Sequence, residues 1–335
     1  MKIPVPVLPE RVWRTYLGGK LLEKRYGGIR ATDGHYPEEW ILSTVHAVDP
    51  EGRNSGICRA VVEGKEVPFT ELHPKMKVLA KIIDSAERLT IQVHPDKAKA
   101  MEYFYSPYGK TECWHILGRR EADSCIYLGF QPWITKEMWR RCFELQDIDA
   151  MLSCLHRIDV KEGETYLVPG GVPHAIGGGC LLLEIQEPSD YTLRVERTTS
   201  SGQEISDMLI HQGIGVERML DCFDYQGMTP RELIGRCRLD RKNVKRNHTV
   251  WECLVGEPHT DCFTLLYRKE KGRFDVHEET EDYGLYIWAG TGKLSCGSGE
   301  YLLHPGSQFY VPAGCGEFYI EAEAILEIFR IEGGT

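Results

Sequence analysis

Residues 160–175, VKEGETYLVPGGVPHA, decide how we interpret the fold of this chain. Within them the run Thr165–Val168 has the composition of a short strand, and a Pro-Gly turn separates it from His174. Residues 303–319, LHPGSQFYVPAGCGEFY, repeat the same spacing of a glycine, five residues, a proline, one residue and a second glycine. Such a strand and turn aim the next inward residue into the mouth of a β-barrel, where a ligand site can form. The sequence therefore predicts two related β units.

Short β-rich runs bounded by Gly, Pro or Asp recur along the chain and indicate a mainly β protein. They cover residues 79–83, 89–93, 125–130, 165–168, 181–185, 191–195, 263–268, 284–288, 307–311 and 324–331. Two other segments, 135–155 and 205–221, carry apolar residues at three-to-four spacing and predict helices, the first with Thr135 as N-cap. The polar run at 238–250 predicts a linker.

Length and composition exclude several classes of protein. The 335 residues suffice for about two domains, and the net charge of −10, without a long Lys/Arg run, disfavours nucleic-acid or anionic-membrane partners. We find neither a signal-peptide core nor an apolar stretch of membrane-spanning length. The twelve cysteines form no C-x-x-C pair, which is typical of free thiols in a reducing compartment, so we expect a cytoplasmic protein.

Four residues offer the chemistry of a metal site. Gln92 and His94 lie two apart on an apparent strand and so face one side, while Glu112 directly precedes another strand. With His174 they provide two imidazoles, a carboxylate and an amide oxygen, which suits zinc; iron, manganese, cobalt or nickel would also be accepted. A lone histidine is more often structural, and these sequence separations are not diagnostic by themselves.

The motif at 160–175 resembles the second sequence motif of cupins, Gly-x5-Pro-x-Gly-x2-His-x3-Asn. The match runs through Gly163, Pro169, Gly171 and His174, and only the final Asn departs, being Gly178. The resemblance implies two jelly-roll β-barrel domains with helical insertions. We predict a metal-binding catalytic domain over residues 1–240, with helical insertions near 135–155 and 205–221, and a second, degenerate domain over 250–335.

The second domain is expected to bind no metal. It retains His277 and Glu281, but its motif has Glu317 where the first copy has His174. We expect this domain to serve packing or to border the active site.

Three longer segments resemble the type I mannose-6-phosphate isomerases, in the short bacterial form. They are IQVHPD at 91–96, GKTECW at 109–114 and the run from 168 to 195. The resemblance implies one Zn²⁺ per chain, held by Gln92, His94, Glu112 and His174. It also implies a small phosphosugar substrate and the interconversion of mannose 6-phosphate and fructose 6-phosphate through a cis-enediol.

The same resemblance places an arginine in the active site, at Arg194, either stabilising the enediolate or holding the phosphate. Glu184 and Lys110 compete for the role of proton-transfer base, and Lys110 could also bind the phosphate. The simpler interpretations are a surface ion pair for Arg194, a satisfied strand-end acid for Glu184 and a solvated loop lysine for Lys110.

Departures from the family pattern concern the phosphate pocket. Trp13 is followed by Arg14 where the family has Gly-Gly, and Trp40 is followed by Ile41 where the family has a second acid. An isomerase acting on a related or non-phosphorylated sugar therefore stays open.

Two other functions compete with isomerisation. His94, Glu112 and His174 also make the ligand set of iron oxygenases built on cupin barrels, although Gln92 as a fourth ligand would fill a position that oxygen needs. A non-catalytic sugar-binding cupin is the second alternative, but the chain has no helix-turn-helix or basic segment to give it an output. The sequence does not predict the oligomeric state.

Overall fold

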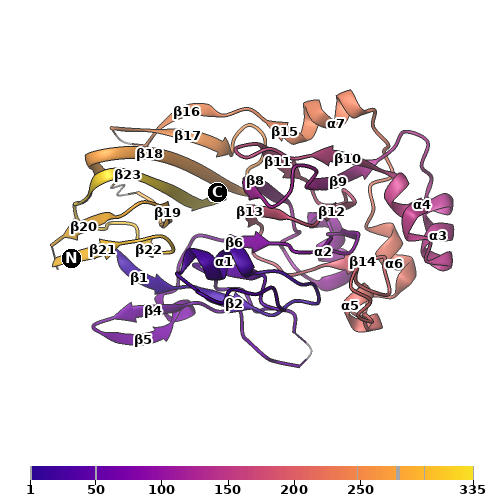
Figure 1. Cartoon of the computed structure of the whole chain (residues 1–335), viewed down its shortest axis with the longest axis horizontal. Coiled ribbons are helices and arrows are strands. Elements are labelled where there is room, and N and C mark those ends of the chain that lie inside the picture. Colours follow the sequence, from indigo (N-terminus) through magenta and orange to yellow (C-terminus); the bar gives the residue numbers. More distant parts are fainter. Residues whose placement is uncertain (1, 50, 247, 277–279, 298, 335) are drawn as a thin grey trace.

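The computed structural model describes residues 2–49, 51–246, 248–276, 280–297 and 299–334 (Figure 1). Strands in three sheets are the main regular structure of these ranges, with short helices between them. The prediction of a mainly β protein is confirmed.

Two sheets build the part of the molecule that carries the predicted site. The seven-stranded sheet runs in the order β15 (Arg238–Leu239), β11 (Thr165–Val168), β8 (Glu112–Arg119), β13 (Cys180–Gln186), β6 (Leu79–Asp84), β3 (Glu38–Ile41) and β2 (Glu10–Val12). The five-stranded sheet runs in the order β10 (Leu155–Asp159), β9 (Cys125–Phe130), β12 (His174–Ile176), β7 (Gln92–Val93) and β14 (Leu193–Arg194). Apolar side chains of both sheets, such as Trp114 and Ile116 from β8 and Leu128 from β9, share one buried core. The two sheets therefore face each other.

The third sheet combines strands from both ends of the chain. Its path is β16 (Lys242–Arg246), β17 (Thr249–Val255), β18 (Phe263–Asp275), β23 (Phe318–Gly333), β19 (Tyr283–Ala289), β22 (Gln308–Val311), β1 (Val5–Leu8), β4 (Arg59–Val62) and β5 (Lys65–Pro68), and β20 (Gly292–Cys296) and β21 (Gly299–Leu303) branch from it. Strand β1 pairs with β22, with Val5 opposite Tyr310. The third sheet thus contains strands from both sides of residues 240–250. The division of the chain into two domains at these residues stays a prediction.

The predicted linker is wrong as a description of local structure. Residues 242–246 form β16, which pairs antiparallel with β17 at the edge of the third sheet. The charged side chains of β16 are exposed or half-buried, as is usual for an edge strand, whose polar residues discourage pairing with other chains. Polarity alone therefore did not distinguish this edge strand from a linker.

Some of the helices cover the outer face of the five-stranded sheet, and others pack beside the seven-stranded sheet. The helices are α1 (Lys20–Arg25), α2 (Lys97–Phe104), α3 (Lys136–Leu145), α4 (Ile148–Ser153), α5 (Asp207–His211), α6 (Val216–Asp221) and α7 (Pro230–Cys237), with a 3₁₀ turn at Phe69–Leu72. Figure 1 shows α3 to α6 gathered at one end of the molecule, opposite the third sheet. The apolar faces of α3 to α6 pack on side chains of the five-stranded sheet, as Trp139 of α3 does against Phe130 of β9.

Each segment predicted as helical holds two short helices. In 135–155, Thr135 caps α3 by accepting a hydrogen bond from the Met138 N–H, and Gln146 ends the helix with a φ of 50°. In 205–221, Gly213 and Gly215 have φ of 88° and 82°, and this left-handed backbone separates α5 from α6. Within the described ranges no helix has the length and apolar character needed to cross a bilayer.

In the second copy of the motif, Glu281 and Glu317 are exposed, while His277 lies outside the described residues. The absence of a metal from this domain stays a prediction.

Candidate active site

Three buried side chains from different strands meet at one end of the two facing sheets. Glu112 opens β8, His174 opens β12 and His94 directly follows β7. Glu112 Oε1 lies 3.3 Å from His94 Nε2 and 3.1 Å from His174 Nε2. The potential ligand atoms of all three residues lie within 4.8 Å of one another, so this group could hold a metal ion.

Backbone carbonyls orient both imidazoles. Nδ1 of His94 is 2.7 Å from the Tyr191 carbonyl oxygen, and Nδ1 of His174 is 2.9 Å from the Val172 carbonyl oxygen. Because a carbonyl only accepts, each Nδ1 carries the proton and each Nε2 presents a lone pair. Burial, together with the charge of Lys110, lowers the pKa of His94 to about 3, so that imidazole is neutral near pH 7. Neutral imidazoles held in this tautomer are suited to metal binding.

Glu112 provides the carboxylate of this group. Both of its oxygens are buried, and neither accepts a hydrogen bond from a described residue. Burial opposes ionisation, but the charge of Lys110, 3.5 Å away, outweighs it and holds the pKa of Glu112 well below its ordinary value. The two oxygens still receive no hydrogen bond, which is costly for a buried carboxylate, and a divalent metal would satisfy them, so the residues present fit such an ion.

Gln92 lies beside this group. It pairs with His174 in the register of β7 and β12, and its Nε2 is 3.2 Å from His174 Nε2. Rotating the side-chain amide by half a turn would place its oxygen, instead of Nε2, beside His174 Nε2. The structure thus brings together all four residues that the sequence predicts as ligands.

Two glycines let the ligand-bearing loops converge. A Cβ at Gly109 would lie 2.8 Å from the Asp96 carbonyl carbon, and one at Gly170 would lie 2.7 Å from the Asp96 Cα. The Lys110 N–H donates to the Pro95 carbonyl, and the Gly171 N–H donates to the His94 carbonyl. The loops at 109–110 and 170–171 therefore close on the backbone at 94–96, an approach that residues without a side chain permit.

Lys110 lies inside the site instead of in a solvated loop. Its side chain is 3% exposed, and its Nζ is 2.9 Å from His94 Nε2. Burial lowers the pKa of Lys110 from its ordinary value, although the charge of Glu112 opposes the change. A lysine with a lowered pKa can exchange protons more readily than a surface lysine.

Glu184 faces the same pocket from the middle of β13. Its Oε2 accepts a hydrogen bond from Trp114 Nε1 at 3.0 Å, and its Oε1 lies 3.0 Å from Lys81 Nζ. Burial and the nearby charge of Glu112 raise the pKa of Glu184. A carboxyl with a raised pKa in a pocket is a candidate general base.

Arg194 ends β14 opposite Gln92 and lines the same pocket. Its Nη1 donates to the carbonyls of Thr192 and Leu209, at 3.2 and 2.7 Å. No carboxylate of the described ranges lies within ion-pair distance of it, so the surface ion pair does not apply. Burial lowers the pKa of Arg194 to about 10, which leaves it charged near neutral pH.

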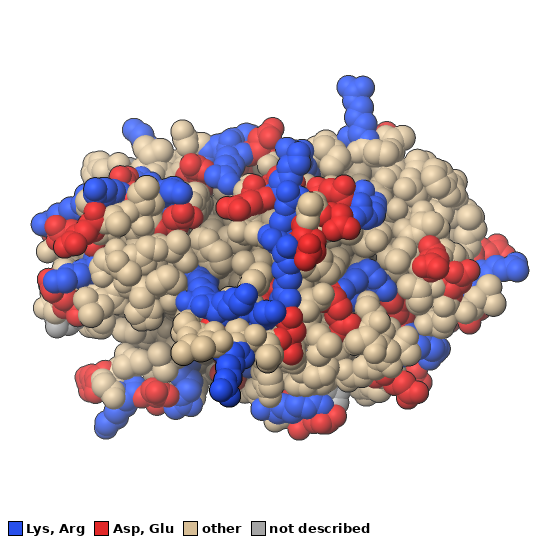
Figure 2. All heavy atoms as spheres, in the orientation of Figure 1, with Lys and Arg blue, Asp and Glu red and all other residues tan. Residues whose placement is uncertain are grey.

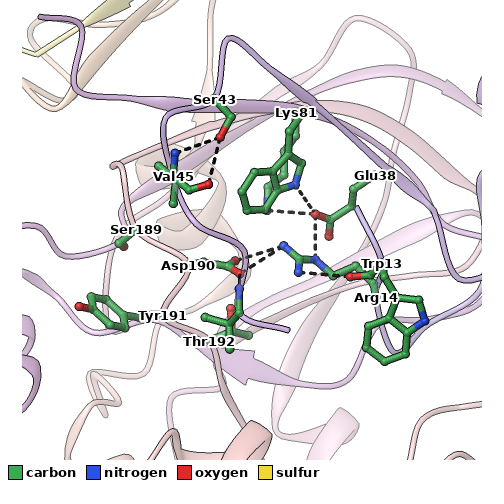
Figure 3. Close-up of polar contacts among 12 residues, drawn as sticks. Trp13, Arg14, Glu38, Ser43, Val45, Lys81, Ser189, Asp190, Tyr191 and Thr192 are labelled. Atoms are coloured by element: carbon green, nitrogen blue, oxygen red, sulfur yellow. Dashed lines mark hydrogen bonds and ion pairs between the residues drawn. The ribbon is translucent and has the colours of Figure 1, made fainter. Parts of the chain in front are cut away.

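Sequence reasoning missed a second group of charged residues around this pocket: Arg14, Glu38, Lys81 and Asp190. Figure 3 shows Arg14 between Glu38 and Asp190, with Lys81 beyond Glu38. Lys81 could have been found, because it interrupts the apolar strand LAKIID at an inward position. Asp190 lacked such a signal, since it lies in polar surroundings in the sequence.

The outer surface differs from this interior. On the face drawn in Figure 2, basic and acidic side chains are interspersed over the molecule. Inside the molecule, four basic and three acidic side chains lie around one cavity.

The fold and the site define a mainly β protein with a buried group that can hold a metal. The chain is 28% identical over 326 residues to the probable mannose-6-phosphate isomerase GmuF of Bacillus subtilis, an alignment that covers 94% of each chain. It is 29% identical to the mannose-6-phosphate isomerase of Streptococcus mutans, covering 90% of this chain and 89% of the relative. The chain is thus a homologue of the mannose-6-phosphate isomerases.

Solved structures agree on the fold. The crystal structure of the mannose 6-phosphate isomerase from Bacillus subtilis superposes with a TM-score of 0.76 at 22% identity, covering 99% of this chain and all of that one. No family model matches the chain.

Proposed function

We propose that this protein is a metal-dependent aldose–ketose isomerase that interconverts mannose 6-phosphate and fructose 6-phosphate. The observation that carries the proposal is the buried group of His94, Glu112 and His174 beside two candidate proton-transfer residues, Glu184 and Lys110. The named relatives support the reaction, since they match this chain over most of its length.

The metal we propose is zinc, one ion per chain. His94, Glu112 and His174 would hold it together with Gln92, a set of nitrogen and oxygen ligands that suits zinc. The ion would stabilise the negative charge that develops on O1 and O2 of the open-chain sugar. Manganese, iron, cobalt and nickel accept the same ligands, so metal analysis must accompany the activity assay.

Isomerisation moves a proton between C1 and C2 of the open-chain sugar, through a cis-enediol. We assign the transfer of the carbon-bound proton to Glu184. Its raised pKa and its position in the pocket suit a base that must take up a proton and return it. Lys110, buried with a lowered pKa, would move the proton between the two oxygens. In this assignment Lys81 keeps Glu184 in place through their 3.0 Å ion pair.

The charges of the pocket favour an anionic substrate. Four basic side chains line it, Arg14, Lys81, Lys110 and Arg194, against three acidic ones, Glu38, Glu184 and Asp190. Arg194 has no carboxylate partner among the described residues, so its guanidinium is free to bind the phosphate or the enediolate. Lys110 is the second candidate for phosphate binding.

The deciding experiment is turnover of mannose 6-phosphate to fructose 6-phosphate, followed by a coupled assay on purified protein. We expect activity that chelation removes and added zinc restores. Activity on mannose alone would point to a non-phosphorylated sugar, and oxygen consumption by iron-loaded protein would point to an oxygenase. Sugar binding with no turnover of mannose 6-phosphate or mannose and no oxygen consumption would indicate a non-catalytic sugar-binding cupin.

We also propose that the protein works in the cytoplasm. Cysteines such as Cys58 and Cys180 are buried free thiols, and burial raises the pKa of both to about 12. Unpaired, protonated thiols are typical of a reducing compartment. Fractionation of cells that express the protein would test this location.

A further inference from the structure

Arg14 is a buried charge to which the proposed reaction assigns no role. Its side chain follows β2, is only 8% exposed and lines the pocket. Nε lies 3.0 Å from Glu38 Oε2, and Nη2 lies 3.3 Å from each oxygen of Asp190. Figure 3 shows the guanidinium directed between these two carboxylates. Arg14 therefore joins two segments, 38–41 and 189–194, that are far apart in the sequence.

The first arm leads from Arg14 to the proposed metal ligands. Asp190 also accepts a hydrogen bond from the Val48 N–H at 2.8 Å, so its carboxylate is fixed from two sides. The next two residues each present a carbonyl to the site. That of Tyr191 accepts from His94 Nδ1 at 2.7 Å, and that of Thr192 accepts from Arg194 Nη1 at 3.2 Å. Fixing Asp190 thus fixes the backbone that orients both side chains.

The second arm leads to the proposed base. Glu38 lies 3.7 Å from Lys81 Nζ, and Lys81 lies 3.0 Å from Glu184. Glu38 also accepts hydrogen bonds from Tyr16 and Trp40, at 2.7 and 2.8 Å, which hold its carboxylate still. One guanidinium therefore reaches the metal side of the pocket through Asp190 and the base side through Glu38.

We infer that Arg14 is a positioning residue that sets the orientation of His94 and Arg194 through Asp190 and of Glu184 through Glu38 and Lys81. An arginine suits this task because its planar fork can hold two carboxylates at fixed angles, whereas a lysine offers a single point charge. Burying such ion pairs adds little net stability, so their benefit here is a defined geometry. The catalytic part of the inference rests on the proposed isomerase activity, and the metal-binding part does not.

The test compares zinc affinity and kinetics in Arg14→Lys. This variant keeps the charge but can contact only one carboxylate well, so the backbone at 190–192 loses a restraint. We expect zinc affinity, measured by competition with a chromogenic chelator, to fall about 10-fold, as for other groups that orient metal ligands. We also expect kcat to fall while KM changes less.

The double variant Arg14→Met/Asp190→Asn provides a second test if the lysine variant does not fold. It removes both charges of the first arm together and leaves Glu38 paired with Lys81, so no new unpaired charge is buried. The same loss of zinc affinity is expected in it.

The matched control is Arg120→Lys. Arg120 also bridges two carboxylates, Asp33 and Asp84, but it does not line the pocket. Folded Arg14 variants with the zinc affinity and kcat of the original protein would overturn the inference, and so would an equal loss in the control. Because zinc affinity is measured without substrate, it gives a result even if mannose 6-phosphate is not turned over, and that separates this inference from the proposed function.

Discussion

At the residue scale, Glu112 carries the strongest indication of a metal. Its two buried oxygens face two imidazole nitrogens and a lysine, and none of these donates a hydrogen bond to them. The charge of Lys110 balances this carboxylate, but buried oxygens without hydrogen bonds are costly, and a metal ion would satisfy them. The histidines, whose lone pairs point the same way, would then complete the coordination.

Replacing His174 tests the assignment of the metal ligands. We expect His174→Ala to lose bound metal and activity together, because it removes one ligand from the group. Metal content by atomic absorption and turnover measure both effects. A variant that keeps one metal per chain would show that the ligand assignment is wrong.

Arg194→Ala is the complementary variant. It should retain the metal, since the guanidinium of Arg194 donates to backbone carbonyls and is not one of the proposed ligands, but lose about 10²–10³ in kcat, as expected for one electrostatic stabiliser. Turnover at the original rate would remove Arg194 from the catalytic set.

The buried carboxyl of Glu38 should make stability depend on pH. Burial opposes ionisation, but the charges of Arg14 and Lys81 prevail and lower the pKa of Glu38 from 4.5 to about 2. Because the folded pKa is the lower one, the stabilisation is fully present above pH 4.5 and is lost as the pH falls toward 2. The shift corresponds to about 3 kcal/mol.

Urea unfolding of the original protein and of Glu38→Gln between pH 7 and pH 3 would measure this effect. The difference in unfolding free energy should shrink below about pH 5. Glu66→Gln is the control, because Glu66 pairs with Arg59 at the exposed surface and should show little difference at any pH. A constant difference for Glu38→Gln would contradict the prediction.

At the element scale, the site depends on how three loops approach each other. Gly109 and Gly170 both pack on the backbone of Asp96, directly after the turn that carries His94. The strands around them could be predicted from sequence, because β6, β9, β11 and β13 have clear apolar runs and turn signals. The close approach of the loops could not, since it follows from the packing of strands that are distant in sequence.

The ligand-type residues could be predicted because each lies in a local sequence motif. Gln92, His94, Glu112 and His174 each lie in a recognisable local pattern, and the fold brings them together. The pair of Arg14 and Asp190 has no local pattern, and 176 positions separate its members. The two residues meet only because the fold brings the segment before β14 next to the segment after β2. Strand β16 was not predicted because it lies at an exposed sheet edge. Its residues are therefore polar, like those of a linker.

Gly170→Ala tests the convergence of the loops. The added Cβ would lie 2.7 Å from the Asp96 Cα, so the turn before His174 must move away from the loop after His94. We expect weaker zinc binding, measured by chelator competition. Gly235→Ala, in helix α7 with open space at its Cβ position, is the control and should leave zinc binding unchanged. Equal affinities in the two variants would contradict this account.

At the scale of the whole molecule, one core joins the site-bearing sheets to the third sheet. Ile82 of β6 and Leu183 of β13 belong to the same buried cluster as Phe263 of β18, Phe329 of β23 and Tyr310 of β22. The pairing of β1 with β22 adds hydrogen bonds between the beginning and the end of the chain. The described parts of the molecule are thus connected by both packing and pairing.

We therefore expect the protein to unfold in a single thermal transition. A shared apolar core makes the two predicted domains depend on each other, because exposing either would expose the other's buried surface. Differential scanning calorimetry would show one peak whose calorimetric and van't Hoff enthalpies agree. Two separated peaks would indicate that the sheets unfold independently.

The pairing of β1 with β22 also has a consequence for biosynthesis. Val5 leaves the ribosome about 300 residues before its partner Tyr310. At ~5–20 residues per second, β1 waits roughly 15 to 60 s for β22 to be synthesised. During that interval β1 and the hairpin of β4 and β5 lack their neighbour in the sheet, and their exposed edge can pair with another nascent chain. Chaperones that bind early would protect this edge until β22 arrives.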